Sequence, residues 1–522
     1  MNKIKVLDCT LRDGGYCNQW NFGYDNITKI VRELDNSSID IIECGFITNR
    51  VDYKKDVTKY TSLNQLTGVI PESNNLFVVM MNYGEYDIEN LPDCDFSPID
   101  GIRLAFHKKD RMKALELCQK IKDKGYRVFI QPMVSLSYKD EEFLEMIRIV
   151  NEIQPYAFYI VDSFGMMKNK DLIRLFYLVE NNLDSDIWIG FHSHNNMQLA
   201  FSNAQTLSEI NTSRNLIIDS SIFGMGRGAG NLNTEIFIQY LNENTGAYYK
   251  LKSILVLIDD IISDFYQKNS WGYSLPNYLS ASYNAHPNYA GFLDDKKTLT
   301  IEAMSEIFEM MDDEKKIEFD KEYIEELYIR FMNTGKVMNI HREELINKIR
   351  NKKILLIAPG KSSISESDKI KKFIGEDSVT ISVNSEFSIS ETDFIFLSNL
   401  RRFRELDNSK KQKCIVTSNI PADSVYYQVN YSELTNNVES VEDNAGLMCI
   451  KLLINLGVKE VYLAGFDGYS HDNSENYAEV KMVQFMKNAL LDSMNQGMNE
   501  VLKKYSQQIN IKFLTGPKYI NI

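Results

Sequence analysis

Two stretches of the sequence carry residue types that could together bind a metal ion. Arg12 and Asp13 follow the apolar run Ile4–Leu7, and Gly14 and Gly15 end any regular element there. An arginine beside a carboxylate at the end of a buried strand is reasonable if Asp13 binds a metal ion and Arg12 neutralises an oxyanion on that ion. Alone, the pair would be interpreted as a surface ion pair.

The second stretch contains His192 and His194, two of only six histidines in the chain. They stand two residues apart on a predicted strand, so both side chains point to the same side. Two imidazoles and the Asp13 carboxylate would leave coordination positions open for a substrate, which favours Mn²⁺ or Mg²⁺ and is also compatible with Zn²⁺. The alternative is a pair of hydrogen-bonded histidines without a metal.

Composition narrows the class of protein. The 522 residues carry a formal net charge of −14, and the basic residues are scattered, which argues against a nucleic-acid partner. No apolar run is long enough to span a membrane, and the N-terminus has no apolar signal region. Seven cysteines without a C-x-x-C motif indicate reduced thiols. We therefore expect a cytoplasmic protein.

Eight short apolar runs alternate with helical stretches over the first 235 residues. Their Val/Ile/Phe-rich composition is typical of parallel strands that are covered on both faces. This alternation predicts an α/β fold with an N-terminal (β/α)8 TIM barrel over residues 1–235, and an open doubly wound sheet is the rival. The runs are Ile4–Leu7, Ile39–Phe46, Leu76–Tyr83, Gly101–His107, Arg127–Ser135, Ala157–Gly165, Ile187–Asn195 and Leu216–Gly224.

Polar residues lie within or at the ends of many of these runs, which favours the barrel because its active site gathers residues from many strand ends. Glu43, Ser163 and the two histidines lie at or near such ends. For Arg103, Gln131 and Asp219 we expect a hydrogen-bonded polar network inside the barrel, since a buried polar group requires partners.

The rest of the chain divides into a helical extension, residues 236–345, and a Rossmann-like α/β domain, residues 352–522, after a basic linker at His341–Lys353. In that domain a predicted strand ends in Gly360-Lys361-Ser362. The spacing is not that of a P-loop, but backbone amides there could bind a phosphate, and Asp467 follows a later strand that would face the same crevice. These four residues are our candidates for binding a nucleotide or nucleotide sugar, although a purely structural or oligomerising domain is the alternative.

Four motifs in order resemble the DRE-TIM metallolyase superfamily, which includes 4-hydroxy-2-oxovalerate aldolase and 3-hydroxy-3-methylglutaryl-CoA lyase. The resemblance covers residues 1 to about 300 and is greatest to the pyruvate-aldolase branch. The motifs are Asp8-Cys-Thr-Leu-Arg-Asp-Gly14, Ile42-Glu-Cys-Gly45, His192-Ser-His-Asn195 and Gly224-Met-Gly-Arg-Gly-Ala-Gly-Asn231.

The resemblance implies roles for individual residues. Asp13, His192 and His194 would be metal ligands, and Asn231 would complete the set. Arg12 would stabilise the oxygen of an enolate. Glu43 matches an acidic residue near that arginine, and Ser163 matches a residue that contacts the pyruvate carboxylate.

One position departs from the pyruvate aldolases. A histidine that serves them as acid/base is replaced by Tyr16, whose ordinary pKa near 10 makes it a poorer base. Either Tyr16 acts with a bound water, or Tyr283 and His286 from a polar-aromatic loop take the role. We therefore expect the acceptor to differ from that of the degradative aldolases.

The sequence thus predicts a divalent-metal-dependent aldolase that joins a 2-oxo acid such as pyruvate to an aldehyde, with a sugar or nucleotide sugar as a candidate in glycan biosynthesis. An acyl-CoA lyase or synthase is the alternative within lyases. A nucleotide-sugar-binding or glycosyltransferase-like protein with an inactive barrel is the alternative of another class. We expect a homo-oligomer.

Overall fold

The computed structural model describes residues 3–296, 299–334, 341–420, 425–479, 482, 486 and 488–521. The chain forms two compact units. The first comprises residues up to Phe292 together with Met311–Phe319, and the second comprises Leu293–Met310 and the chain from Asp320 onward. The helical extension therefore contributes to both units.

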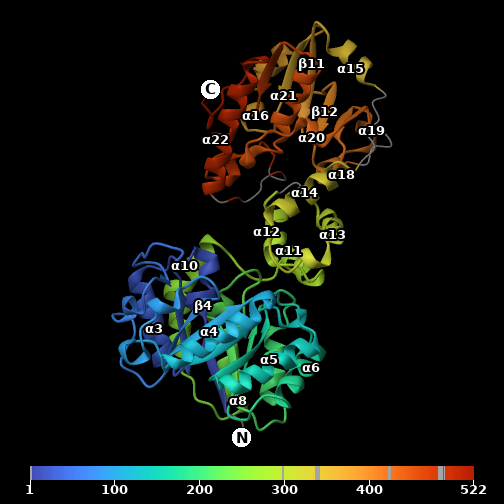
Figure 1. Cartoon of the computed structure of the whole chain (residues 1–522). Helices are drawn as coiled ribbons and strands as arrows, with labels where there is room; N and C mark the ends of the chain where they lie inside the picture. Colours follow the sequence, from blue (N-terminus) through green and yellow to red (C-terminus); the bar gives the residue numbers. More distant parts are fainter. Residues whose placement is uncertain are drawn as a thin grey trace. The chain divides into compact units, whose positions relative to one another are not determined.

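The first unit is a closed barrel of eight parallel strands, as the sequence predicts (Figure 1). Closure follows from β1, which pairs with β2 on one side and with β9 on the other. A two-residue strand, β3 (Lys59–Tyr60), pairs with the end of β2 outside this ring. The barrel strands are β1 (Ile4–Asp8), β2 (Ile41–Ile47), β4 (Leu76–Asn82), β5 (Gly101–Phe106), β6 (Arg127–Pro132), β7 (Ala157–Asp162), β8 (Trp188–Ser193) and β9 (Leu216–Ser220).

Alternation along the strands divides the apolar side chains between the two faces of the barrel wall. Leu7, Ile41 and Ile217 pack with Phe129 in an inner cluster, whereas their neighbours on the strands pack outward against the helices. Figure 1 shows helices around the strands. They include α3 (Tyr24–Asn36), α4 (Arg111–Asp123), α5 (Asp140–Ile153), α6 (Asn169–Glu180), α7 (Ala200–Glu209) and α8 (Thr234–Asn244).

The inward positions change from apolar to polar toward the carboxyl ends of the strands. Glu43, Gln131 and Asp219 each lie two residues after an inward apolar side chain, so they occupy the next level of the interior. All three are buried. The interior of the barrel is therefore apolar below and polar toward the carboxyl ends of the strands.

The helical extension contains short helices. Leu251–Tyr266 has the apolar spacing of a helix in the sequence, and it forms α9 and α10 with one π turn, Ile258–Ile262, between them. The expected linker at His341–Lys353 instead contains helix α15, because Leu345 and Ile349 provide an apolar face that is buried. The helices are α9 (Leu251–Leu257), α10 (Ser263–Lys268), α11 (Leu275–Ser282), α12 (Pro287–Asp295), α13 (Ile301–Glu309), α14 (Lys321–Met332) and α15 (Arg342–Ile349).

The second unit contains a seven-stranded parallel sheet in the order β14-β13-β12-β11-β10-β15-β16. The order reverses direction at β10, which pairs with β11 on one side and β15 on the other. Such a reversal opens a crevice at the carboxyl ends of the two strands. The strands are β10 (Lys353–Ile357), β11 (Ser378–Val383), β12 (Phe394–Leu397), β13 (Cys414–Thr417), β14 (Tyr427–Val429), β15 (Glu460–Ala464) and β16 (Asn510–Phe513).

The sequence of this unit predicts two helices, Val441–Leu456 and Tyr477–Tyr505. Helix α21 (Ala445–Asn455) forms within the predicted range Val441–Leu456, and the Asn444 side chain accepts a hydrogen bond from its first turn. Helix α22 (Asn488–Tyr505) begins well after the predicted start at Tyr477, and part of the interval lies outside the described residues. Tyr477 itself is in a loop. In the described part of the chain, no helix is both long and apolar enough to cross a membrane.

Candidate metal centre

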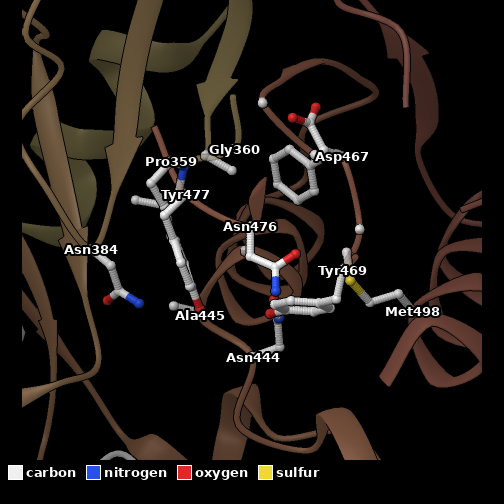
Figure 2. A pocket seen from close by; sticks show the side chains of 16 residues that line it. Pro359, Gly360, Asn384, Asn444, Ala445, Asp467, Tyr469, Asn476, Tyr477 and Met498 are labelled. Atoms are coloured by element: carbon white, nitrogen blue, oxygen red, sulfur yellow. Dashed lines mark hydrogen bonds between the residues drawn. The ribbon is translucent and has the colours of Figure 1, made fainter. Parts of the chain in front are cut away.

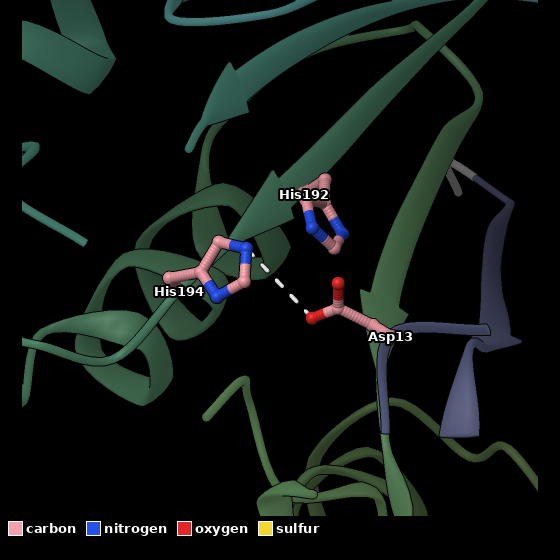
Figure 3. A group of neighbouring side chains, drawn as sticks. All are labelled: Asp13, His192 and His194. Carbon is pink, nitrogen blue, oxygen red and sulfur yellow. Dashed lines mark ion pairs between the residues drawn. The ribbon is translucent and has the colours of Figure 1, made fainter. Parts of the chain in front are cut away.

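The centre of the candidate site is Asp13, His192 and His194, whose ligand atoms all lie within 4.8 Å of one another (Figure 3). Asp13 ends the short helical turn α1 (Thr10–Asp13) directly after β1, and the histidines lie at the end of β8. Figure 3 shows both imidazole rings next to the Asp13 carboxylate. The structure thus brings together the three residues that the sequence proposed as ligands.

The orientation of His192 is fixed from behind by Asp219 on the neighbouring strand β9. His192 Nδ1 lies 3.0 Å from Asp219 Oδ2. Because a carboxylate only accepts, Nδ1 carries the proton and Nε2 keeps its lone pair for a ligand. Asp219 is held in turn by Arg103 and by the Tyr159 hydroxyl at 3.1 Å. This is the support that a metal-binding histidine usually has.

Protonation also favours metal binding. Burial lowers the pKa of His194 to about 3, so its ring is neutral at neutral pH. Burial alone would raise the pKa of Asp13, but Arg12, His194 and His192 outweigh it and hold that pKa below its usual range. His194 Nε2 and Asp13 Oδ2 are 3.7 Å apart. A neutral imidazole facing an ionised carboxylate is the state that binds a cation.

Asn231 gives independent support for a cation site. Its Nδ2 donates to Asp13 Oδ2 at 2.6 Å, while its Oδ1 is buried and has no hydrogen-bond partner. A buried carbonyl oxygen without a partner is unfavourable unless something occupies it. A hard divalent cation is a suitable occupant for an amide oxygen, so the four residues fit such an ion.

Arg12 is directed by two carboxylates and keeps one donor unused. Its Nε donates to Glu43 at 2.8 Å and its Nη1 to Asp13 at 2.6 Å, whereas Nη2 is buried without a partner. Glu43 lies between Arg12 and Arg103, the latter at 2.9 Å. Both Glu43 oxygens are therefore engaged with arginines, which makes Glu43 a positioning residue for Arg12.

The remaining barrel candidates lie at the mouth. Ser163 is buried, and its hydroxyl accepts the Val134 amide proton at 2.9 Å. Tyr16 is 42% exposed and packs edge-on against Trp20. His286 is held between Phe164 and Phe319. Tyr283, half-buried at the end of α11, precedes His286 by three residues.

Two functional residues were not singled out from the sequence. Asp219 was expected to belong to an internal polar network, and it does, but its contact with His192 assigns it to the metal centre. Arg227, in the loop after β9, lies beside Ser163 and His286. An arginine flanked by Gly226 and Gly228 was the signal that could have identified it.

The candidate residues of the second unit lie near the crevice between β10 and β15 (Figure 2). Gly360 and Asp467 line it together with Asn384, Asn444 and Tyr477. The Ser362 amide donates to Asp467 Oδ2 at 2.8 Å, and Lys361 forms an ion pair with Glu475 at 2.5 Å. A carboxylate from the loop after β15 thus occupies the Ser362 amide, and Asp467 Oδ1 and Asn384 Oδ1 remain buried without partners.

The fold and the ligand set define a (β/α)8 protein with a candidate divalent-metal centre at the carboxyl ends of its strands. Residues 103–259 match the HMGL-like family model. The barrel therefore contains an HMGL-like domain of the DRE-TIM type, as the motifs predict. This match covers a part of the barrel and none of the parallel sheet in the second unit.

Three individual proteins or domains are similar to part of this chain. The chain is 25% identical over 245 residues to a 4-hydroxy-2-oxovalerate aldolase of Pseudoalteromonas translucida, covering 46% of this chain and 70% of that one. It is 25% identical over 240 residues to an oxaloacetate decarboxylase of Mycobacterium tuberculosis, covering 45% and 69%. A solved N-terminal domain of a candidate aldolase from Bacteroides vulgatus is 28% identical, covers 57% of this chain and 98% of that chain, and has a TM-score of 0.48.

Proposed function

We propose that this chain is a carbon–carbon lyase, a divalent-metal-dependent aldolase that joins the enolate of pyruvate or a related 2-oxo acid to an aldehyde, or cleaves the product. The observation that carries the proposal is the pair of orphaned polar atoms, Arg12 Nη2 and Asn231 Oδ1, on either side of the Asp13 carboxylate. The Asn231 carbonyl oxygen could bind a cation, and the Arg12 Nη2 donor could bind an oxyanion. Relatives named as an aldolase and a decarboxylase of 2-oxo acids support it.

A divalent ion held by Asp13, His192, His194 and Asn231, with Mn²⁺ or Mg²⁺ favoured over Zn²⁺, would supply Lewis-acid polarisation of a chelated oxo acid. The chain's own residues provide the rest. Arg12 directs Nη2 at the oxygen on which negative charge develops, and Glu43 holds that guanidinium in place. Ser163 lies at the rim with its hydroxyl fixed by Val134, where it can contact the carboxylate of the oxo acid.

The proton acceptor is proposed to be Tyr16 with a bound water. His286 is the weaker candidate, because burial and the nearby Arg227 charge lower its pKa to about 2, which makes its ring a poor base. Tyr16 is exposed enough to exchange protons with solvent. A Tyr16→Phe variant that loses exchange at the pyruvate methyl group, beside a His286→Gln variant that keeps it, would distinguish the two roles.

The test of the proposed function is metal-dependent exchange of deuterium into the methyl group of pyruvate, followed by NMR. We expect wild-type exchange with Mn²⁺ or Mg²⁺ and none after chelation. His192→Ala should abolish exchange with the barrel still folded. His341→Ala, which changes an exposed histidine of the second unit, is the matched control. Wild-type exchange in the His192 variant would refute the ligand assignment.

The same experiment separates the two alternatives. Cleavage of a 3-hydroxyacyl-CoA without pyruvate exchange would identify an acyl-CoA lyase. A purified protein that binds no divalent ion would indicate an inactive barrel.

We further propose that the crevice of the second unit binds the sugar or nucleotide-sugar portion of a substrate in glycan biosynthesis. Buried acceptors without partners on Asn384 and Asp467 call for hydroxyl or amino donors, and Tyr477 lines the same crevice (Figure 2). Calorimetric titration with a panel of nucleotide sugars tests this proposal. Asp467→Asn should weaken binding at least tenfold, whereas Asp492→Asn, at an exposed ion pair of the same unit, should not.

A further inference from the structure

The loop that follows β9 places Arg227 beside the metal centre. The preceding residue, Gly226, is so close to the ligands that a Cβ there would lie 2.3 Å from Asn231 Nδ2 and 2.8 Å from Asp13 Oδ2. The amide of Gly230 donates to the carbonyl of Arg227 at 3.1 Å, which fixes the loop backbone. Arg227 therefore extends from a rigid support over the barrel mouth.

The guanidinium of Arg227 has few acceptors. Its Nη2 donates to the Ser163 carbonyl at 3.2 Å, and its Nε is buried without a hydrogen-bond partner. Among the described residues no carboxylate forms an ion pair with it, in contrast to Arg12 and Arg103, which each contact two. Its other neighbour is the Tyr16 ring, whose centroid is 5.3 Å away. A guanidinium with an unused buried N–H is suited to binding an anion.

His286 faces the guanidinium of Arg227. Arg227 Nη1 lies 3.3 Å from His286 Nε2, and because a guanidinium only donates, Nε2 is the acceptor of this hydrogen bond. The Asn288 amide lies 3.2 Å from Nδ1 of the same ring. His286 therefore holds the Arg227 guanidinium through Nη1, while Nε remains without a partner.

His286 is held where it can make this contact. Its ring packs edge-on against Phe164, with centroids 5.6 Å apart, and lies 6.2 Å from the ring of Phe319. Its backbone amide donates to the Lys316 carbonyl at 2.8 Å. The segment 311–319 thus returns to the barrel mouth and fixes the histidine opposite Arg227.

We propose that Arg227, held in place by His286, binds an anionic group on the acceptor, so that the acceptor is an aldehyde bearing a carboxylate or a phosphate. This inference rests on the proposed aldolase function. In the proposed function the 2-oxo acid is bound deeper in the barrel, at the site formed by Asp13, His192, His194 and Arg12. Arg227 instead contacts Tyr16, whose ring is exposed to solvent.

The test compares acceptors that differ only in charge: D-glyceraldehyde 3-phosphate against D-glyceraldehyde, and succinic semialdehyde against butanal, each with pyruvate. In the wild type we expect kcat/KM to be higher for the charged member of at least one pair by about tenfold or more. Whichever pair shows the preference identifies phosphate or carboxylate as the recognised group. Arg227→Gln should reduce that ratio by about 10- to 100-fold, mainly through KM, and Arg227→Lys should restore part of it.

Arg174→Gln, which removes an exposed guanidinium paired with Asp140, is the matched control and should keep the wild-type ratio. Equal ratios in the wild type and Arg227→Gln would overturn the inference. So would a large rise in the KM for pyruvate in the exchange assay, which contains no acceptor, because it would assign Arg227 to the oxo acid. Absence of pyruvate exchange in the wild type refutes the aldolase proposal itself and the inference with it.

Discussion

Replacing Asp219 by Asn tests whether the buried network behind His192 serves the metal centre. The carboxylate accepts from His192 Nδ1 at 3.0 Å, from Arg103 and from Tyr159. An asparagine is nearly isosteric, but its amide group would present a donor to His192 or to Arg103. His192 would then lose its fixed tautomer and orientation. Loss of such a partner typically lowers metal affinity 10- to 100-fold, which is about 1.4–2.7 kcal/mol.

The expected effect on stability is smaller than for an ordinary broken buried ion pair. Leaving a buried charge without its partner costs about 3–5 kcal/mol. Arg103, however, keeps its second carboxylate, Glu43, at 2.9 Å. We therefore expect the free energy of unfolding to fall by less than about 3 kcal/mol, which a domain with a stability of 5–15 kcal/mol tolerates. The variant should be folded and weak in metal binding.

The assay is competition between the protein and a chromophoric chelator for Mn²⁺, with guanidinium unfolding measured on the same preparations. Tyr159→Phe is the control, because it removes one hydrogen bond to Asp219 and leaves His192 and all charges in place. Its metal affinity should change by no more than about threefold. Wild-type affinity in Asp219→Asn would show that the network is structural only and would refute the reasoning.

Three further predictions concern the same site. Arg12→Lys, which cannot keep the contacts to Glu43 and Asp13 while presenting a further donor, should lower pyruvate exchange by about 10²–10³-fold with metal affinity nearly unchanged, measured by NMR and chelator competition. Gly226→Ala should reduce metal affinity in a folded protein, because its Cβ would overlap Asn231 Nδ2; unchanged affinity would contradict the described loop geometry. His286, whose pKa is lowered to about 2, binds no proton in the folded state at pH 5 but binds one when unfolded, since its unfolded pKa is about 6.5. Its contribution to stability is therefore present above pH 6.5 and is lost as the pH falls, and calorimetry at pH 5 should find one proton fewer taken up on unfolding of His286→Gln than of the wild type.

Periodicity predicts the architecture well because strands buried on both faces leave a strong apolar signal. All eight barrel runs contain a strand, and the strands begin close to the predicted starts, but β6, β7 and β9 end several residues before the predicted ends. The short β3 is different, since Lys59–Tyr60 has no pattern of its own and pairs only because the chain passes the end of β2. The start of helix α22 was also not predicted. Residues near Tyr477 have helical composition, but Tyr477 lines the crevice beside β10 and β15, and the helix begins at Asn488.

The candidate ligands could be predicted because the carboxyl ends of all barrel strands meet at one mouth. The fold therefore brings Asp13 close to the two histidines. Their supporting contacts could not. The pairing of His192 with Asp219 depends on the register of β8 and β9, and the contact of Arg227 with His286 depends on a loop and on residues 311–319 returning to the barrel. Such contacts join segments far apart in the sequence, and no local pattern marks them.

The charges of the buried network explain why a cation and an acidic substrate belong together here. Asp13, Glu43 and Asp219 form ion pairs with Arg12 and Arg103, so these five residues carry a net charge of −1 in a place with little solvent. A divalent ion would reverse this to +1, which the single carboxylate of a 2-oxo acid would neutralise. A second anion at the same mouth would again be unbalanced unless another cation were supplied. Arg227, without a carboxylate partner among the described residues, is positioned to be that cation, and the paired aldehydes test whether the acceptor carries the second negative charge.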